Sequence, residues 1–134
     1  MTIEEAISKF VEAQRYVRRR LYEAYSIPEA ISATEWTLRR ADIKELHAKD
    51  PTAKVFRPHG YGLEFKDHEV HVDFDFCQSG RIDGFDAWRI FCFCDDNNLD
   101  CGFSHHSEFD SALKKLEEVG VVEKEENLYF MKQN

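Results

Sequence analysis

Three polar residues of the central sequence have the spacing that acid–base or metal chemistry requires. His71, Asp73 and Asp75 alternate along a predicted strand, so they project from one face in steps of roughly 7 Å. Two carboxylates and an imidazole at this spacing can share a metal ion or divide acid and base roles between them. Alternating polar residues are also the default on the solvent face of an antiparallel sheet, so this face is equally a candidate binding surface.

A second group of candidates carries sulfur and imidazole ligands. Cys92 and Cys94 are one residue apart in a predicted helix, where their side chains point about 200° apart and cannot bind one ion together. Structural zinc sites need four ligands and typically use cysteine pairs separated by two to four residues. Two interpretations stay open, namely buried free cysteines, which are common in protein interiors, and a zinc site. The zinc site would use Cys94, Cys101, His105 and His106.

The familiar catalytic motifs are missing from the sequence. His59-Gly60-Tyr61-Gly62 is interpreted as the loop that enters a hairpin, since glycine suits such turns. The chain contains no H-E-x-x-H motif, phosphate loop or dinucleotide fingerprint. We therefore expect no cofactor, no resident metal and no catalytic residue. The alternative hypothesis is a metal-dependent enzyme that uses His71, Asp73 and Asp75.

A hairpin is predicted to position the polar strand. Residues 61–66 and 69–77 alternate between apolar and polar side chains, which is typical of half-buried strands. With Asp67 and His68 as the turn, the apolar residues share one face and the polar ones the other. The expected pairs are Lys66 with Glu69, Phe65 with Val70, Glu64 with His71, Leu63 with Val72, and Tyr61 with Phe74.

Two helices and a short strand are predicted before this hairpin. Residues 3–25 form an amphipathic helix with a Thr2–Glu5 capping box. Its apolar stripe comprises Ile3, Ile7, Phe10, Val11, Gln14, Val17, Leu21 and Ala24. The Arg18–Arg19–Arg20 run is expected on the solvated side. A second helix over residues 29–48 would begin at Pro28, with a possible fresh start at Thr34, and residues 54–57 form a short strand.

Two further helices and a closing hairpin are predicted after it. The helix over residues 85–96 is apolar around most of its circumference, which indicates a place in the core or in a partner interface. Asp83 and Asp86 are expected to cap it. A helix opened by Ser107 ends at Gly120, and Val121-Val122 pairs with residues 128–131 around residues 124–127. This last part resembles a winged helix, but its acidity disfavours contact with DNA. The chain is predicted to be one α+β domain over residues 1–134: N-terminal helices, a central antiparallel β-hairpin or sheet, two more helices and a C-terminal β-hairpin.

Charge is distributed unevenly along the chain. Residues 67–134 contain 16 acidic and 6 basic side chains, whereas residues 1–66 contain 10 acidic and 12 basic ones, for a net charge of −8. The acidic half repels nucleic acid and attracts basic proteins. The N-terminus lacks the basic start and apolar run of a signal peptide, and no apolar stretch is long enough to span a membrane. We expect a cytoplasmic protein with reduced thiols.

The motifs HGYG (59–62), VDFDF (72–76), GRID (80–83) and GFDAWR (84–89) together resemble a family of small bacterial proteins encoded near polymorphic or contact-dependent toxin modules. The resemblance covers residues 59–90 well and the C-terminal third loosely. It implies an immunity protein, and it carries no catalytic or binding residue to these positions. The hypothesis is therefore a cytoplasmic protein that neutralises a cognate toxin, or another basic protein, by stoichiometric binding. The predicted contact residues are Glu64, His71, Asp73, Asp75, Asp83 and Asp86.

Overall fold

The chain combines helices with antiparallel strands, which confirms the predicted α+β class. A computed structural model describes residues 1–32, 34–35, 38, 56–59, 62–67, 70–75 and 77–132, with the backbone alone for residues 20, 21, 24 and 25 and for the strands between 56 and 75. The elements in chain order are α1 (Ile3–Tyr25), β1 (Phe56–His59), β2 (Gly62–Asp67), β3 (Val70–Asp75), α3 (Ala87–Asp96), α4 (His106–Glu118), β4 (Val122–Glu125) and β5 (Leu128–Met131).

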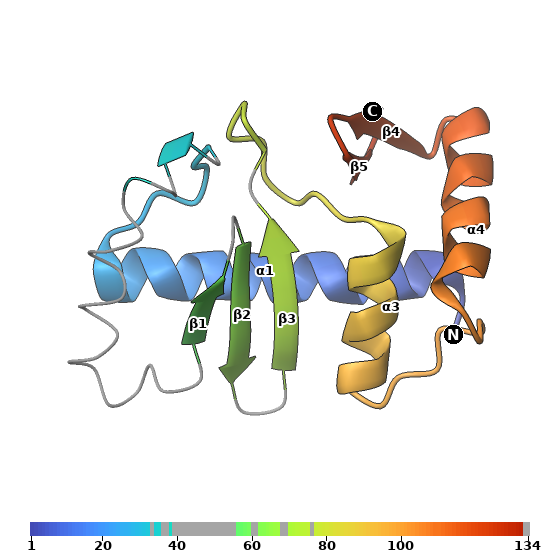
Figure 1. The fold of residues 1–134 in the computed structure, drawn as a ribbon, viewed down its shortest axis with the longest axis horizontal. Coiled ribbons are helices and arrows are strands. Elements are labelled where there is room, and N and C mark those ends of the chain that lie inside the picture. The colour runs from blue at the N-terminus through green and yellow to red at the C-terminus, as the bar shows by residue number, and fades with distance from the viewer. Residues whose placement is uncertain are drawn as a thin grey trace.

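The long helix α1 organises the arrangement in space. It lies across the back of the three-stranded sheet and of α3, with α4 at its N-terminal end (Figure 1). Thr2 caps α1 as predicted, since its Oγ1 accepts the Glu5 N–H at 3.1 Å. The Glu5 carboxylate returns to the Thr2 side chain, whose hydroxyl donates to Oε1 at 3.2 Å, whereas a full capping box would use the Thr2 backbone N–H. None of the described helices combines the length and apolar character that crossing a membrane requires.

The apolar face of α1 forms one side of the main core. Ile7, Phe10 and Val17 are at most 1% exposed, and the Phe10 ring meets the Phe93 ring of α3 edge-on at 5.4 Å between centroids. The prediction for Arg18 is wrong, because this side chain is 4% exposed and donates from Nη1 to the Glu29 carbonyl at 2.7 Å. Burial lowers the pKa of Arg18 to about 10.

The central hairpin is present with a register two residues away from the predicted one. Phe65 lies opposite Val72, and Glu64 lies opposite Asp73. The predicted turn is wrong because Asp67 is the last residue of β2 and pairs with Val70. Since side chains alternate with period two, a shift by two residues preserves the alternation, and the sequence pattern is compatible with both registers.

β1 lies on the edge of this sheet, in the order β1-β2-β3. It begins two residues later than predicted and contains Pro58, which an edge strand tolerates because no neighbour needs its missing N–H. β3, at the other edge, is the strand that packs against α1 and α3.

The predicted second helix falls largely outside the described residues. Residues 29–32 are not helical, so the start at Pro28 is wrong. Ser32 Oγ accepts the Glu35 N–H at 3.1 Å, which places a helix start after Ser32. Thr34 does not cap that start; its hydroxyl donates to Gln78 Oε1 at 2.8 Å. Residues 36–37 and 39–48 lie outside the description.

α3 and α4 end in the same way, in Schellman motifs. After α4, the Gly120 N–H donates to the Glu117 carbonyl and the Val121 N–H to the Leu116 carbonyl, and Gly120 has φ +82°. The predicted position of Gly120 is thus confirmed. After α3, Asn98 takes the same left-handed position with φ +56°, and the Leu99 N–H donates to the Cys94 carbonyl. The N-cap of α4 is His105, and not Ser107 as predicted.

The chain closes with the two-stranded sheet of β4 and β5. The turn comprises Glu126 and Asn127, two residues fewer than predicted, because Lys124 and Glu125 pair with Tyr129 and Leu128. Phe85 extends this sheet: its N–H donates to the Tyr129 carbonyl at 2.9 Å, and the Tyr129 N–H donates back at 2.7 Å.

A connecting segment, residues 80–86, joins β3 to α3 and contacts both ends of the chain. Gln14 of α1, fully buried, donates from Nε2 to the Gly84 carbonyl at 2.8 Å. On the other side, a Cβ at Gly84 would lie 2.9 Å from Leu128 Cδ1 and 3.1 Å from the Phe130 ring. A side chain at position 84 would therefore displace Leu128 or Phe130, so the close approach to β5 favours glycine.

We expect Gly84→Ala to lower the free energy of unfolding by about 1–3 kcal/mol, the usual range for overpacking a core. Chemical denaturation of the variant and the native chain measures this difference. Because Leu128 Cδ1 is the nearest atom, the penalty should shrink when Gly84→Ala is introduced into a Leu128→Ala background. An equal penalty in both backgrounds would contradict the steric explanation.

Candidate functional site

Charged side chains of the connecting segment were among the predicted contact residues, and the structure gives them internal partners. Arg15 of α1 binds Asp83, with Nη2 at 2.9 Å and Nε at 3.0 Å from Oδ2. This hydrogen bond raises the pKa of Arg15. Asp83 does not cap α3 as predicted; it has φ +67° and turns toward α1.

Asp86 caps α3, as predicted, but as the N-cap itself. Its Oδ1 accepts the Arg89 N–H at 2.8 Å, and Oδ2 also pairs with the Arg89 guanidinium. A carboxylate at this position satisfies a free N–H and interacts favourably with the helix dipole. Asp86 therefore sets where α3 begins and which way it leaves the connecting segment.

Arg81 holds the connecting segment to the C-terminal hairpin. Its guanidinium binds Glu125 at 3.1 Å and pairs with Glu123, while it stacks over the Phe130 ring at 4.0 Å from the centroid. Glu123 and Glu125 alternate on β4 and so project from the same face. The two carboxylates raise the pKa of Arg81.

A groove of about 490 Å³ opens beside these ion pairs. Its polar lining consists of Arg15, Arg81 and Asp83, whose charges are already paired with one another or with β4. The remaining lining is apolar: Val11, Ile82, Phe130 and Met131. This lining has no nucleophile, and its one carboxylate, Asp83, is bound through Oδ2 to Arg15, so the groove suits packing and binding better than catalysis.

The predicted strand-face residues are placed by their backbone alone. In the register, Glu64 is opposite Asp73, Lys66 is opposite His71, and Gly62 is opposite Asp75. The side chains of Glu64, His71, Asp73 and Asp75 lie outside the described part of the structure. Their role in partner binding or catalysis stays a prediction.

The predicted zinc ligands do not come together as a set. Among the described residues, which include all four, no group of three or more His, Cys, Asp or Glu side chains is arranged to hold a metal ion. His105 uses Nδ1 to accept the Ser107 N–H at 3.2 Å, and its ring stacks on His106 at 4.3 Å between centroids. Cys94 and Cys101 are neighbours in the core and are 1% and 6% exposed.

All four cysteines are free thiols, as expected, and three of them are buried. Burial, with the Cys101 thiol alongside, raises the pKa of Cys94 to about 11. Burial, with the Glu126 carboxylate as a second cause, raises the pKa of Cys77 to about 12. Both groups are therefore neutral near pH 7 and poor nucleophiles.

Two residues that the sequence pattern did not single out matter at the surface. Arg15 gives no sequence signal, because a lone arginine on the polar side of a helix has no predicted partner. Trp88 was placed in a buried helix, yet it is 55% exposed. The sequence does contain a signal for this exposure. A helix that is apolar around nearly its whole circumference has more apolar surface than one face of the core can bury.

We expect Cys77 and Cys94 to resist a thiol reagent in the folded protein at pH 8, because the reactive thiolate is scarce when the pKa is about 12 or 11. Counting modified thiols per chain by mass spectrometry, with and without denaturant, tests this. Because the folded chain favours the neutral thiols, these groups also contribute to the free energy of unfolding. That contribution is complete below pH 9 and is lost as the pH rises toward 11 to 12. Rapid labelling of Cys77 in the native chain would contradict the assignment.

Comparison with known proteins identifies a family for this chain. No curated protein and no solved structure was found to match the chain. A family model described as Domain of unknown function (DUF6896) matches residues 3–131, from the start of α1 to the end of β5. The match includes the connecting segment and the two elements that hold it, α1 and the C-terminal hairpin. The chain therefore belongs to the DUF6896 family.

Proposed function

We propose that this chain is a small binding protein that neutralises a basic partner protein by stoichiometric association. Its specific form would be an immunity protein against a bacterial toxin. The observation that supports this proposal is the excess of acid on the second half of the chain. Residues 77–132 contain twelve acidic and six basic side chains.

Ion pairs inside residues 77–132 engage part of the basic side chains and leave the excess of acid in this region unchanged. Arg81 is held by Glu123 and Glu125, Arg89 is held by Asp86, and Lys114 lies 3.3 Å from Asp110. Half of the basic side chains in residues 77–132 are thus engaged with acids of the same region. Exposed acids occur at the end of α3, along α4 and in the β4–β5 turn: Asp95, Glu117, Glu118 and Glu126.

Such a surface favours a basic partner. At physiological salt the field of exposed charges reaches about 8 Å, which is enough to steer an approaching protein. Like charges repel nucleic acid, so a phosphate backbone is a poor occupant. The predicted strand-face acids, Asp73 and Asp75, add to the same negative half in the sequence.

The immunity role rests on the resemblance to bacterial proteins encoded near toxin modules, together with this charge. Asp83 and Asp86 contribute to the field, but an arginine already binds each of them. Direct partner contacts therefore fall to the exposed acids and to the predicted strand face. The alternative, a metal-dependent enzyme using His71, Asp73 and Asp75, depends on side chains outside the description, and no observation on the described residues favours it.

Co-purification tests the proposal most directly. A tagged chain is expressed together with the neighbouring reading frames, and proteins recovered at stoichiometric amounts are identified. We expect a basic partner that is toxic when expressed alone and harmless in the complex. Recovery of the bare chain, with no toxic neighbour, would contradict the immunity role.

Removal of exposed acidic charges should lower the association rate with the partner much more than it lowers the stability of the fold. We expect Asp73→Asn with Asp75→Asn, and separately Glu117→Gln with Glu118→Gln, to slow association with the partner and to flatten its dependence on salt. The Tm should change little. The matched control is Glu4→Gln with Glu23→Gln, which removes the same charge from exposed positions of α1. Equal association rates for all three pairs would contradict electrostatic steering by the acidic half.

A further inference from the structure

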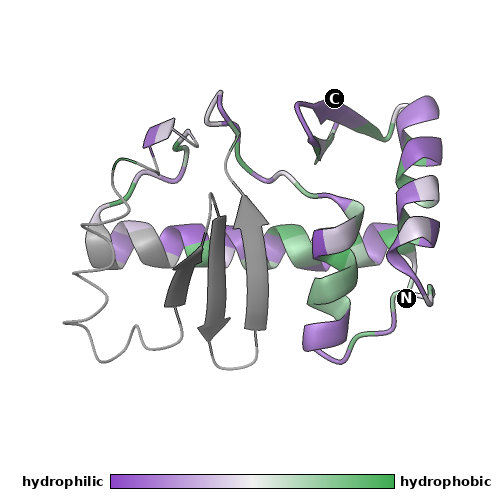
Figure 2. Cartoon of the chain, in the orientation of Figure 1, coloured by the Kyte–Doolittle hydropathy of each residue, from purple (hydrophilic) through white to green (hydrophobic). Residues whose placement is uncertain are grey.

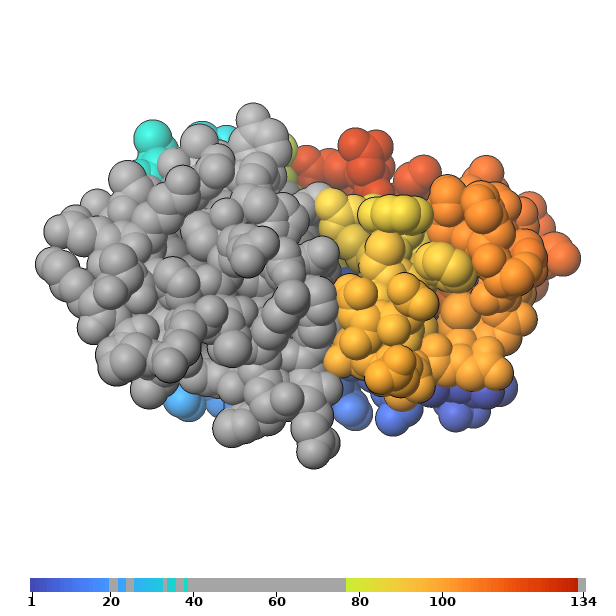
Figure 3. All heavy atoms as spheres, turned by 60° about the horizontal axis from the view of Figure 1, so that its bottom comes forward, coloured from blue at the N-terminus to red at the C-terminus, as the bar shows by residue number. Residues whose placement is uncertain are grey.

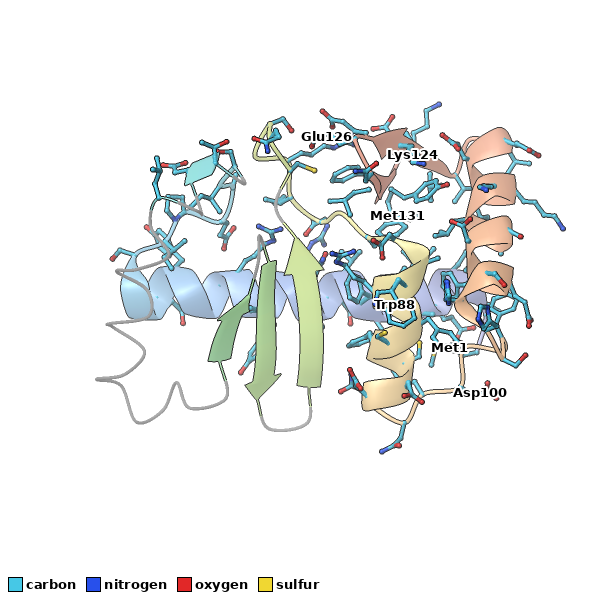
Figure 4. All side chains as sticks on the ribbon, viewed as in Figure 1. Met1, Trp88, Asp100, Lys124, Glu126 and Met131 are labelled. Carbon is cyan, nitrogen blue, oxygen red and sulfur yellow. The ribbon has the colours of Figure 1, made fainter. Side chains whose placement is uncertain are left out.

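The most apolar described helix leaves its largest side chain in solvent. Ala87, Ile90, Phe93 and Cys94 of α3 are buried, and the middle of α3 is hydrophobic whereas its C-terminal end is hydrophilic (Figure 2). Trp88 projects from the opposite side, toward α4, and is 55% exposed (Figure 4). α3 and α4 lie side by side on one face of the molecule (Figure 3). An exposed tryptophan is costly in water and common at binding hot spots.

The neighbouring rings hold Trp88 in one place. The indole meets the His106 ring edge-on, with 5.0 Å between centroids and an angle of 88°. His106 stacks on His105, and His105 is fixed as the N-cap of α4 by hydrogen bonds to the N–H and Oγ of Ser107. The tryptophan is therefore ordered before any partner arrives, which lowers the entropic cost of binding.

Charges along α3 favour a cation next to the indole. At 100° per residue, Cys92 and Asp95 share the side of α3 that carries Trp88, and Asp95 lies about 10 Å farther along the axis. Asp95 and Asp96 are exposed. Within α3, all of whose residues are described, Arg89 is the one basic residue, and Asp86 binds it. A cation that approaches the ring thus meets acids and no unpaired positive charge of this helix.

We propose that the surface formed by Trp88, Asp95 and His106, here the Trp88 face, is the docking site for a basic protein. An arginine or lysine of that protein lies on the indole ring, and Asp95 binds a neighbouring basic residue. The π face of tryptophan attracts cations more strongly than other aromatic rings do. This inference rests on the proposed function and names the surface through which it acts.

A model cation tests the surface without the partner. Hexa-arginine is titrated into the ¹⁵N-labelled full chain, and the indole N–H signal of Trp88 is followed together with the backbone amides. We expect saturable shifts centred on α3 and the start of α4. Trp88→Leu, which keeps an apolar side chain beside His106, should weaken binding several-fold. Adding Asp95→Asn to this variant should weaken binding further. Tyr22→Ala is the matched control, because Tyr22 is 57% exposed and lies on α1.

Shifts confined to other elements, or an equal affinity for Trp88→Leu and the native chain, would overturn the proposal. With a partner in hand, Trp88→Ala and Trp88→Leu should weaken binding at least about tenfold, the scale of a hot-spot residue, whereas Tyr22→Ala should not. A genuine toxin partner that binds these Trp88 variants at full strength would overturn the Trp88 face and leave the immunity role standing. If hexa-arginine binds at Trp88 but no toxic partner exists, the Trp88 face stands and the immunity role is overturned.

Discussion

The hydrogen bond from the Gln14 amide to the Gly84 carbonyl is the contact on which the described structure depends. It joins the first helix to the connecting segment inside the core, where an unpaired carbonyl would be costly. The same glycine packs against Leu128 and Phe130, so residues from the beginning, middle and end of the chain are in contact at this point. Neither neighbour leaves space for a side chain at position 84.

Ion pairs around this point serve orientation more than stability. Arg15–Asp83 and Arg81–Glu123/Glu125 are partly exposed, and pairs of this kind contribute little free energy on their own. They instead hold α1 and the C-terminal hairpin against the connecting segment. The motif GRIDGFDAWR, one part of the family resemblance, is thus explained largely by architecture. Its tryptophan is the exception, since no internal packing accounts for its exposure.

The sequence predicted most of the described elements, but it missed several of their ends and most of their long-range partners. Capping by Thr2 and the C-terminal position of Gly120 followed from local rules, because each depends on residues within one helical turn. The register of the central hairpin did not follow, since two registers separated by two residues satisfy the same alternation. Arg18 was assigned to the solvent because the carbonyl that accepts its hydrogen bond, that of Glu29, belongs to a loop after the helix. Long-range contacts such as Asp83 with Arg15 leave no trace in a local pattern.

The position of α1 at the start of these elements also constrains how the chain folds. α1 is synthesised first, yet Phe10 and Val17 gain their cover from residues that emerge later, among them Phe85 and Phe93. Closing such long loops costs entropy before native contacts repay it, so the last steps are slow compared with helix formation. During synthesis the apolar stripe of α1 stays open until α3 has left the ribosome. A nascent chain stalled before α3 would therefore expose this stripe and become a substrate for chaperones or for aggregation.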